Sequence, residues 1–240
     1  MKNTAKQIIG KMVAEDYRTA AVFQEYDIDF CCQGNLTIEE ACQTKSIEID
    51  KVLTDLAAIQ EQEDDTTPEY QFWPLDQLAD HIQSEHHKYT EQAIEQIKPL
   101  LDKICNVHGG HHPELYEVQK EFMKSAGELT THMKKEEFIL FPYIKKLVTQ
   151  GQVSSPLFKT VQNPISMMME EHNTEGERFR KISSLTGKYR PPADACNTYI
   201  LTYALLKKLE EDLHLHIHLE NNILFPRSLA LEKKLSHKKH

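Results

Sequence analysis

The residues best suited to chemistry in this sequence are histidines that a glutamate follows four residues later. Two such pairs, His132 with Glu136 and His216 with Glu220, belong to one longer motif, which ends in Ile-Leu-Phe-Pro and recurs 84 residues further along the chain. Residues four apart lie on one face of a helix, so both side chains can reach one metal ion. Imidazole and carboxylate ligands without a thiolate suit a pair of Fe or Mn ions better than structural Zn.

Four long stretches with apolar residues at helical spacing would position these side chains. They cover residues 75–104, 113–150, 163–186 and 192–226. Only 8 Gly and 10 Pro occur among 240 residues, which also favours long helices over many turns. We therefore predict an all-α protein whose larger part is an antiparallel four-helix bundle. The repeated motif falls on the second and fourth helices, which indicates approximate internal symmetry.

Position relative to the apolar stripes selects the candidate ligands on three of these helices. His216 and Glu220 lie in the middle of the stripe of the fourth helix, where an unpaired buried charge would be costly. His132 and Glu136 lie at the flank of the second stripe, and His172 lies in the third. A single buried histidine is as often a core residue as a ligand. Three helices that each direct His or Glu inward favour a metal site.

The first helix leaves two candidates, and the fourth helix has two histidines that we set aside. At 100° per residue, His86 falls at the centre of the first stripe and His87 at its edge, so periodicity slightly favours His86. His214 and His218 fall outside the stripe of the fourth helix. We expect these two to be solvated.

The chain divides into two parts of different character. We predict a small helical domain over residues 1–59, a polar and acidic linker over 60–73, the bundle over 74–230, and a basic tail over 231–240. Within the first part, Thr37 and Glu40 have the spacing of a capping box that begins a helix.

The five cysteines form an odd and sparse set, which is typical of reduced thiols and not of a disulfide framework. Cys31 and Cys32 are adjacent, so their side chains diverge and chelate one tetrahedral ion poorly. A disulfide between neighbours would be strained and readily reduced. Two readings stay open from the residues alone: a pair of small buried side chains, or a redox or transfer pair near the mouth of the bundle.

Charge and hydropathy exclude several classes of partner. The net charge of −9 disfavours binding to nucleic acid or to an anionic membrane. No apolar run approaches the roughly 18 residues of a membrane span, and no secretory signal is visible at the start. We expect a cytoplasmic protein. Its oligomeric state stays open, with a homodimer as one option.

Taken together, the motifs resemble those of the iron–sulfur cluster repair di-iron proteins, the Repair of Iron Centers family. The resemblance runs over nearly the whole chain, and its pieces occur in the family's order: DFCCQGN, HHKYTE, VHGGHHPEL, HMKKEEFILFP, EEHNTEG and HIHLENNILFP. One departure is Gln33, where the family often has the first of two glycines after the cysteine pair.

The resemblance implies a hemerythrin-like bundle with two non-haem Fe ions, bridged by carboxylates and by oxo or hydroxo groups. It favours His87 over His86. It also implies functional roles for Glu171, beside the third-helix ligand, and for Cys31 and Cys32 as a redox or transfer pair. The implied metal ligands are four histidines and two bridging glutamates: His87, His132, His172, His216, Glu136 and Glu220.

The resemblance also implies a function, with alternatives. The family repairs iron–sulfur clusters damaged by nitrosative or oxidative stress, by donating iron, by reacting with NO, or both. The implied partners are damaged iron–sulfur proteins or a cluster-assembly scaffold, with NO or O₂ as small ligands. A hemerythrin-type protein that binds or senses O₂ is the main alternative, and a di-iron NO reductase or oxidase is another. Whether the chain is an enzyme stays open.

Overall fold

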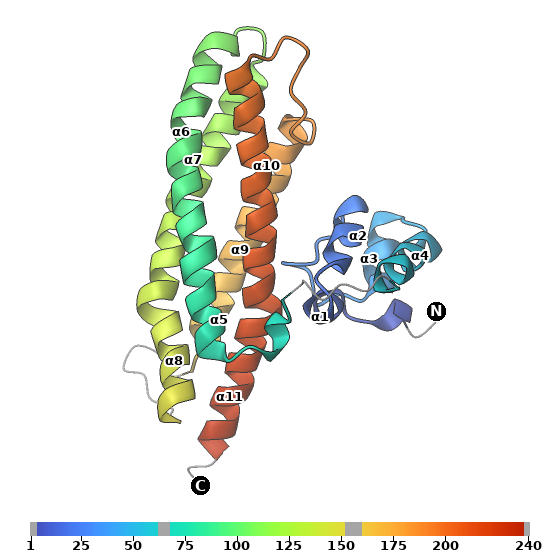
Figure 1. Cartoon of the computed structure of the whole chain (residues 1–240), viewed down its shortest axis with the longest axis vertical. Helices are drawn as coiled ribbons and strands as arrows, with labels where there is room; N and C mark the ends of the chain where they lie inside the picture. The colour runs from blue at the N-terminus through green and yellow to red at the C-terminus, as the bar shows by residue number, and fades with distance from the viewer. Residues whose placement is uncertain (1–3, 62–67, 152–159, 238–240) are drawn as a thin grey trace.

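The computed structural model describes residues 4–61, 68–151 and 160–237. Over these ranges the chain is helical and has no β-strand, only one isolated bridge between Ile8 and Thr37. The predicted all-α class is therefore confirmed. A small group of helices from the first part of the chain lies beside a long bundle (Figure 1). Residues 62–67 of the predicted linker, and the end of the predicted tail, lie outside the described residues.

The N-terminal helices enclose an apolar core of their own, which includes Phe23, Phe30 and Leu56. Thr37 and Glu40 form the predicted capping box, in which each side chain bonds the backbone N–H of the other residue. This cap starts the third of four helices. They are α1 (Ile9–Glu15), α2 (Thr19–Glu25), α3 (Ile38–Lys45) and α4 (Ile49–Gln60).

The bundle consists of four long helical rods, three of which contain a short π-helical turn (Figure 1). The third rod is the single helix α9 (Gln162–Leu185). The first contains α5 (Leu75–His81), the π turn Ile82–His87 and α6 (Lys88–His108). The second contains α7 (Glu114–Lys135), the π turn Glu136–Leu140 and α8 (Phe141–Gln150). The fourth contains α10 (Asn197–His218), the π turn Leu219–Leu224 and α11 (Phe225–His237).

The predicted ranges match the first three rods within a few residues, but the fourth was misplaced at both ends. It begins at Asn197 and not at 192, because Pro192 to Ala195 form a turn closed by a backbone hydrogen bond of 3.1 Å. It also continues past Pro226 to His237, into the segment predicted as a tail. Pro226 does not end the rod because it lies in the first turn of α11, where a missing N–H is tolerated.

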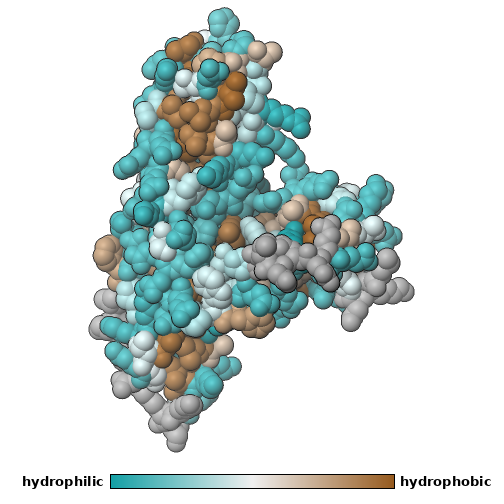
Figure 2. All heavy atoms as spheres, in the orientation of Figure 1, coloured by the Kyte–Doolittle hydropathy of each residue, from teal (hydrophilic) through white to brown (hydrophobic). Residues whose placement is uncertain are grey.

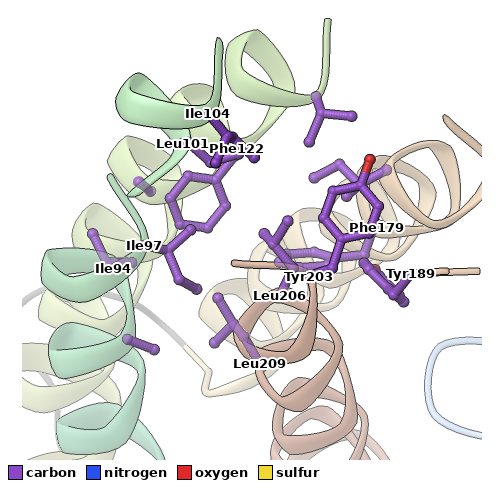
Figure 3. Close-up of a cluster of buried hydrophobic side chains, with 14 of the residues drawn as sticks. Ile94, Ile97, Leu101, Ile104, Phe122, Phe179, Tyr189, Tyr203, Leu206 and Leu209 are labelled. Carbon is purple, nitrogen blue, oxygen red and sulfur yellow. The ribbon is translucent and has the colours of Figure 1, made fainter. Parts of the chain in front are cut away.

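Two apolar clusters fill the bundle, one above the middle of the rods and one below. The upper cluster joins α6, α7, α9 and α10 and includes Leu101, Phe122 and Leu206 (Figure 3). The lower one includes Ile82 and Phe225. On each rod a candidate histidine comes between residues of the two clusters. The polar site is therefore enclosed by apolar layers on both sides.

The N-terminal domain covers part of the fourth rod, and this corrects one prediction. His218, expected to be solvated, is only 1% exposed. Its ring lies 5.8 Å from that of Phe30 and 6.0 Å from that of Tyr17. His214 is half-buried, with its ring 6.0 Å from that of Phe30. The outer face of α10 is thus an interface between two parts of the chain, which the periodicity of one helix does not reveal.

The middle of the bundle is mostly hydrophilic on the face in Figure 2, with apolar side chains gathered toward its two ends. No helix among the described residues is both long enough and apolar enough to cross a membrane.

Glu210 on α10 provides a pH-dependent test of this packing. Burial, with the nearby charge of Glu211, raises the pKa of Glu210 from 4.5 to about 7. A carboxyl whose pKa is higher in the folded state binds its proton more tightly there, so the protein loses stability as pH rises from about 4.5 to 7. We expect Glu210→Gln to raise Tm by a few degrees at pH 8 and to change it little at pH 5, measured by circular dichroism at equal metal content.

Glu177→Gln is the control, since Glu177 is an exposed glutamate of another rod, α9, and its replacement should shift Tm little at either pH. An equal gain for Glu210→Gln at both pH values would contradict a raised pKa at Glu210.

Candidate metal centre

Six buried side chains from all four rods converge into two groups of potential metal ligands. Within each group, one ligand atom from every residue lies within 4.8 Å of the others. Both groups share the same two glutamates, Glu136 and Glu220. One group is His87, Glu136, His216 and Glu220, and the other is His132, Glu136, His172 and Glu220.

Each shared glutamate directs one oxygen to each group. Oε2 of Glu136 lies 3.3 Å from Nε2 of His87, and its Oε1 lies 3.3 Å from Nε2 of His132. Glu220 is arranged in the same way, with Oε1 at 3.2 Å from His216 Nε2 and Oε2 at 3.1 Å from His172 Nε2. Two carboxylates that each span both groups are suited to bridging a pair of ions.

The π turns lie where the rods carry these ligands. His87 ends the first turn, Glu136 begins the second, and Glu220 is the second residue of the third. A π turn adds one residue to a helical turn and is frequent at functional sites. It changes which face of the rod the following side chains occupy, so that ligands and apolar residues can alternate along one inward face.

The first π turn explains why constant periodicity favoured His86. The extra residue rotates the rod, and it is His87 that faces Glu136. His86 is also buried, but it donates from Nδ1 to Asp212 Oδ1 at 3.0 Å, and its ring stacks on His216 at 5.6 Å. The structure therefore places His87 in a ligand group and His86 beside it.

In three of the candidate histidines, a hydrogen bond at Nδ1, on the side of the ring away from the ligand groups, determines that Nε2 faces the site. Each of these Nδ1 atoms has an oxygen acceptor and so carries the proton, which leaves the Nε2 lone pair directed inward. Glu171, expected near the third-helix ligand, serves as one of the acceptors and also pairs with Lys135. The pairs are His87 with Glu137 (3.0 Å), His132 with Glu171 (2.8 Å) and His172 with Asn221 (2.9 Å).

The histidine nitrogens and carboxylate oxygens that face the site require a cation. Nε2 of His132 and Nε2 of His172 lie only 2.9 Å apart, so two neutral rings would repel through their lone pairs unless a proton or a metal ion lies between them. The carboxylate oxygens of Glu136 and Glu220 are fully buried and meet no hydrogen-bond donor among the described residues. Buried charges without partners are costly. Metal ions between these atoms would remove both penalties, so the residues present fit a pair of metal ions.

The negative charge of the buried glutamates also strengthens the binding of a proton to His132. Burial alone would lower the pKa of His132, but the charge of Glu136 outweighs it, and the pKa rises to about 10. The pKa of Glu220 is held well below its usual range, because its contacts with His216 and His172 together outweigh the effect of burial, although burial lowers the pKa of His216 itself.

The cysteine pair lies against the same site. Sγ of Cys32 lies 3.5 Å from the backbone oxygen of His172, and the two sulfur atoms are 3.7 Å apart, as free thiols. Cys31 is buried, and hydrogen bonding with Cys32 raises its pKa well above the usual range. Asp29 completes a third group of potential ligands with them, but its Oδ1 already accepts from the backbone N–H groups of both cysteines.

A cavity of about 270 Å³ opens beside the metal site. Its lining includes His132, His172 and His216, together with Lys135 and Glu171. A small molecule could therefore approach the site from the side of α7 and α9 without separation of the rods.

An antiparallel bundle with buried His and Glu groups at its centre defines the class of hemerythrin-like metal-binding proteins. Residues 78–228 match the family described as "Hemerythrin HHE cation binding domain", whose members bind metal cations, and residues 5–60 match "Domain of Unknown function (DUF542)".

Curated relatives extend this match to the whole chain. The chain is 36% identical to "Iron-sulfur cluster repair protein YtfE" of Enterobacter sp. (strain 638), over 94% of this chain and 98% of that protein. It is 35% identical to "Probable iron-sulfur cluster repair protein" of Haemophilus influenzae, over 94% and 97%, and 29% identical to "Iron-sulfur cluster repair protein ScdA" of Staphylococcus haemolyticus, over 92% and 97%. The chain therefore belongs to the family of iron–sulfur cluster repair proteins.

The structure brings together all six residues that the sequence suggested as ligands, and their binding of metal stays a prediction. Sequence reasoning missed Glu137 and Asn221, which orient His87 and His172. The repeated motif contained a signal for both residues, because each directly follows the glutamate of its copy and the two therefore occupy the same position in the repeat.

Removing one ligand should reduce metal binding. His132→Ala or Glu220→Ala takes away a metal ligand that no neighbouring side chain replaces. We therefore expect iron content after loading with Fe(II), measured by metal analysis, to fall well below that of the unmodified protein.

His87→Ala should lower iron content in the same way, whereas His86→Ala should retain iron. His111→Ala, on an exposed loop residue, is the control. Full iron content in all three ligand variants would disprove the assignment.

Metal should also stabilise the fold, because the buried carboxylates of Glu136 and Glu220 meet no hydrogen-bond donor among the described residues and bound cations would compensate their charge. We expect the metal-free protein to unfold at a lower temperature than the loaded protein, measured by calorimetry. The difference should shrink in Glu220→Ala. Equal Tm values for the loaded and metal-free protein would mean that the site is stable without metal.

Proposed function

We propose that this protein repairs iron–sulfur clusters damaged by nitric oxide or oxidants, using a non-haem di-iron centre held by the two ligand groups. The observation that carries the proposal is the pair of buried carboxylates, each with one oxygen directed to each group. The names of the curated relatives support the same function.

The donor set is compatible with iron. The two groups offer histidine nitrogens and carboxylate oxygens and no sulfur, a combination that suits Fe or Mn. Six protein ligands leave coordination positions of two ions free for small molecules. Bound iron would supply one-electron chemistry and an affinity for NO or O₂.

The chain's own residues prepare the site for this role. His132 is oriented by Glu171, and His87 is oriented by Glu137. The cavity beside His132, His172 and His216 gives NO or O₂ a route to the ligand groups. The apolar clusters above and below exclude bulk water from the rest of the bundle.

The cysteine pair has the role of a redox or transfer group. The thiol of Cys32 contacts the backbone oxygen of His172, and His172 is itself a member of a ligand group. We assign to Cys31 and Cys32 one of two roles. They supply two electrons to the centre, with oxidation of the two thiols to a disulfide and release of two protons, or they receive iron from it. The partners are damaged iron–sulfur proteins or a cluster-assembly scaffold, in the cytoplasm, where thiols stay reduced.

The decisive experiment uses protein purified without oxygen. Two Fe per chain, with a Mössbauer spectrum of coupled non-haem iron, and faster recovery of an NO-damaged iron–sulfur enzyme would support the proposal. Stopped-flow spectra with O₂ and with NO separate the alternatives. A stable and reversible oxygenated species without any repair would identify an O₂ carrier, and repeated turnover of NO would identify a reductase.

Replacing both thiols tests the role of the pair. We expect Cys31→Ser with Cys32→Ser to retain iron, because neither residue belongs to the two ligand groups, but to slow recovery of the damaged enzyme in a coupled assay. Cys196→Ser, which changes an exposed thiol at the far end of α10, is the control. Repair at the normal rate in the double variant would mean that the pair is structural.

A further inference from the structure

The carboxamide of Asn221 contacts both parts of the chain. This residue follows Glu220 in the π turn of the fourth rod and is 7% exposed. Its Oδ1 lies 2.9 Å from Nδ1 of His172, and its Nδ2 lies 3.2 Å from the backbone oxygen of Cys31. One amide therefore contacts a candidate ligand on one side and the cysteine loop, which we define as residues 29–34, on the other.

The orientation of this amide follows from its partners. A backbone carbonyl oxygen only accepts hydrogen bonds, so the NH₂ group of Asn221 must face Cys31 and its oxygen must face His172. His172 therefore donates from Nδ1 and presents Nε2 to the metal site, where it lies 3.1 Å from Oε2 of Glu220. Outer hydrogen bonds of this kind fix both the tautomer and the ring orientation of a metal-binding histidine.

The neighbouring Asn222 contacts the same loop but no candidate ligand. Its Nδ2 lies 3.2 Å from the backbone oxygen of Phe30, 3.4 Å from that of Cys31, and 3.1 Å from Nδ1 of His218. Two adjacent asparagines thus hold the cysteine loop, and of these two only Asn221 also contacts the ring of His172. The chain therefore contains a matched control for the role of Asn221.

We propose that Asn221 is a positioning residue that couples the cysteine loop to the metal centre. While the loop is docked, Asn221 is held from both sides and fixes His172 in the orientation that binds metal. When the loop leaves, Asn221 loses one of its two partners, and His172 holds metal less tightly. Coupling between two binding events is reciprocal, so bound metal also holds the loop in place. The inference rests on the proposed metal centre but not on repair activity.

The first measurement is the rate at which Fe(II)-loaded protein loses iron to an excess of chelator. Loss of an outer hydrogen-bond partner of a ligand typically weakens metal binding about 10–100-fold. We expect Asn221→Leu to lose iron at least about 10-fold faster than the unmodified protein. Asn221→Asp keeps an acceptor for His172 but can no longer donate to Cys31, so it should lose iron at a rate between those of the unmodified protein and Asn221→Leu.

The second measurement is the rate of Cys32 alkylation by a maleimide, followed by peptide mass spectrometry with and without bound iron. In the unmodified protein, iron should slow alkylation, because bound metal holds the loop. In Asn221→Asp and Asn221→Leu the rate should no longer depend on iron. Asn222→Ala should raise the rate overall but keep its dependence on iron. Loss of packing alone would not separate the two asparagines in this way.

The outcomes distinguish a failure of this inference from a failure of the proposed function. If the unmodified protein binds no iron, the metal centre itself is wrong. If it binds iron, but Asn221→Leu releases iron at the normal rate and Cys32 alkylation in Asn221→Asp still depends on iron, the coupling is wrong and the metal centre stands.

Discussion

The structure depends on the burial of two carboxylates, Glu136 and Glu220, in the middle of a helical bundle. Neither has a hydrogen-bond donor among the described residues, and both are completely inaccessible to water. Such groups are tolerated only where another charge compensates them. The inward histidines, the outer partners that fix their tautomers, and the apolar layers on both sides all follow from this requirement. The N-terminal domain adds a further outer contact, through Asn221 and Cys32.

The repeated motif gives this arrangement its approximate symmetry. In both copies the glutamate lies in a π turn and the proline lies in the first turn of the following α-helix. Proline lacks the N–H that would bond the preceding turn, so a wider turn before Pro142 or Pro226 loses little. The first rod has a π turn without a proline, at Ile82–His87. The proline therefore accompanies the wide turn in the repeat and is not required for it.

Much of this fold could be predicted from the sequence, and the errors have physical causes. Amphipathic spacing located the four rods, because the apolar stripe of a rod is continuous over many turns. It did not predict the π turns, which change the register within a rod, and so it favoured His86 over His87. It also treated His218 as solvated, because the periodicity of one helix says nothing about a second domain that covers its outer face. Motif and burial together suggested the six side chains that the structure brings together. Glu137 and Asn221 act on the outer nitrogen of a ring and leave no signal in the apolar periodicity.

The position of the metal site between two separate apolar clusters has a consequence for how the protein unfolds. A bundle with one continuous core behaves as a single cooperative unit. Here the upper and lower clusters are joined across a polar layer whose attraction depends on bound ions. With metal present, the layer connects the halves and the rods act as one unit. Without it, we expect the layer to join the halves less strongly, so that the rods can open at one end while the other end stays packed.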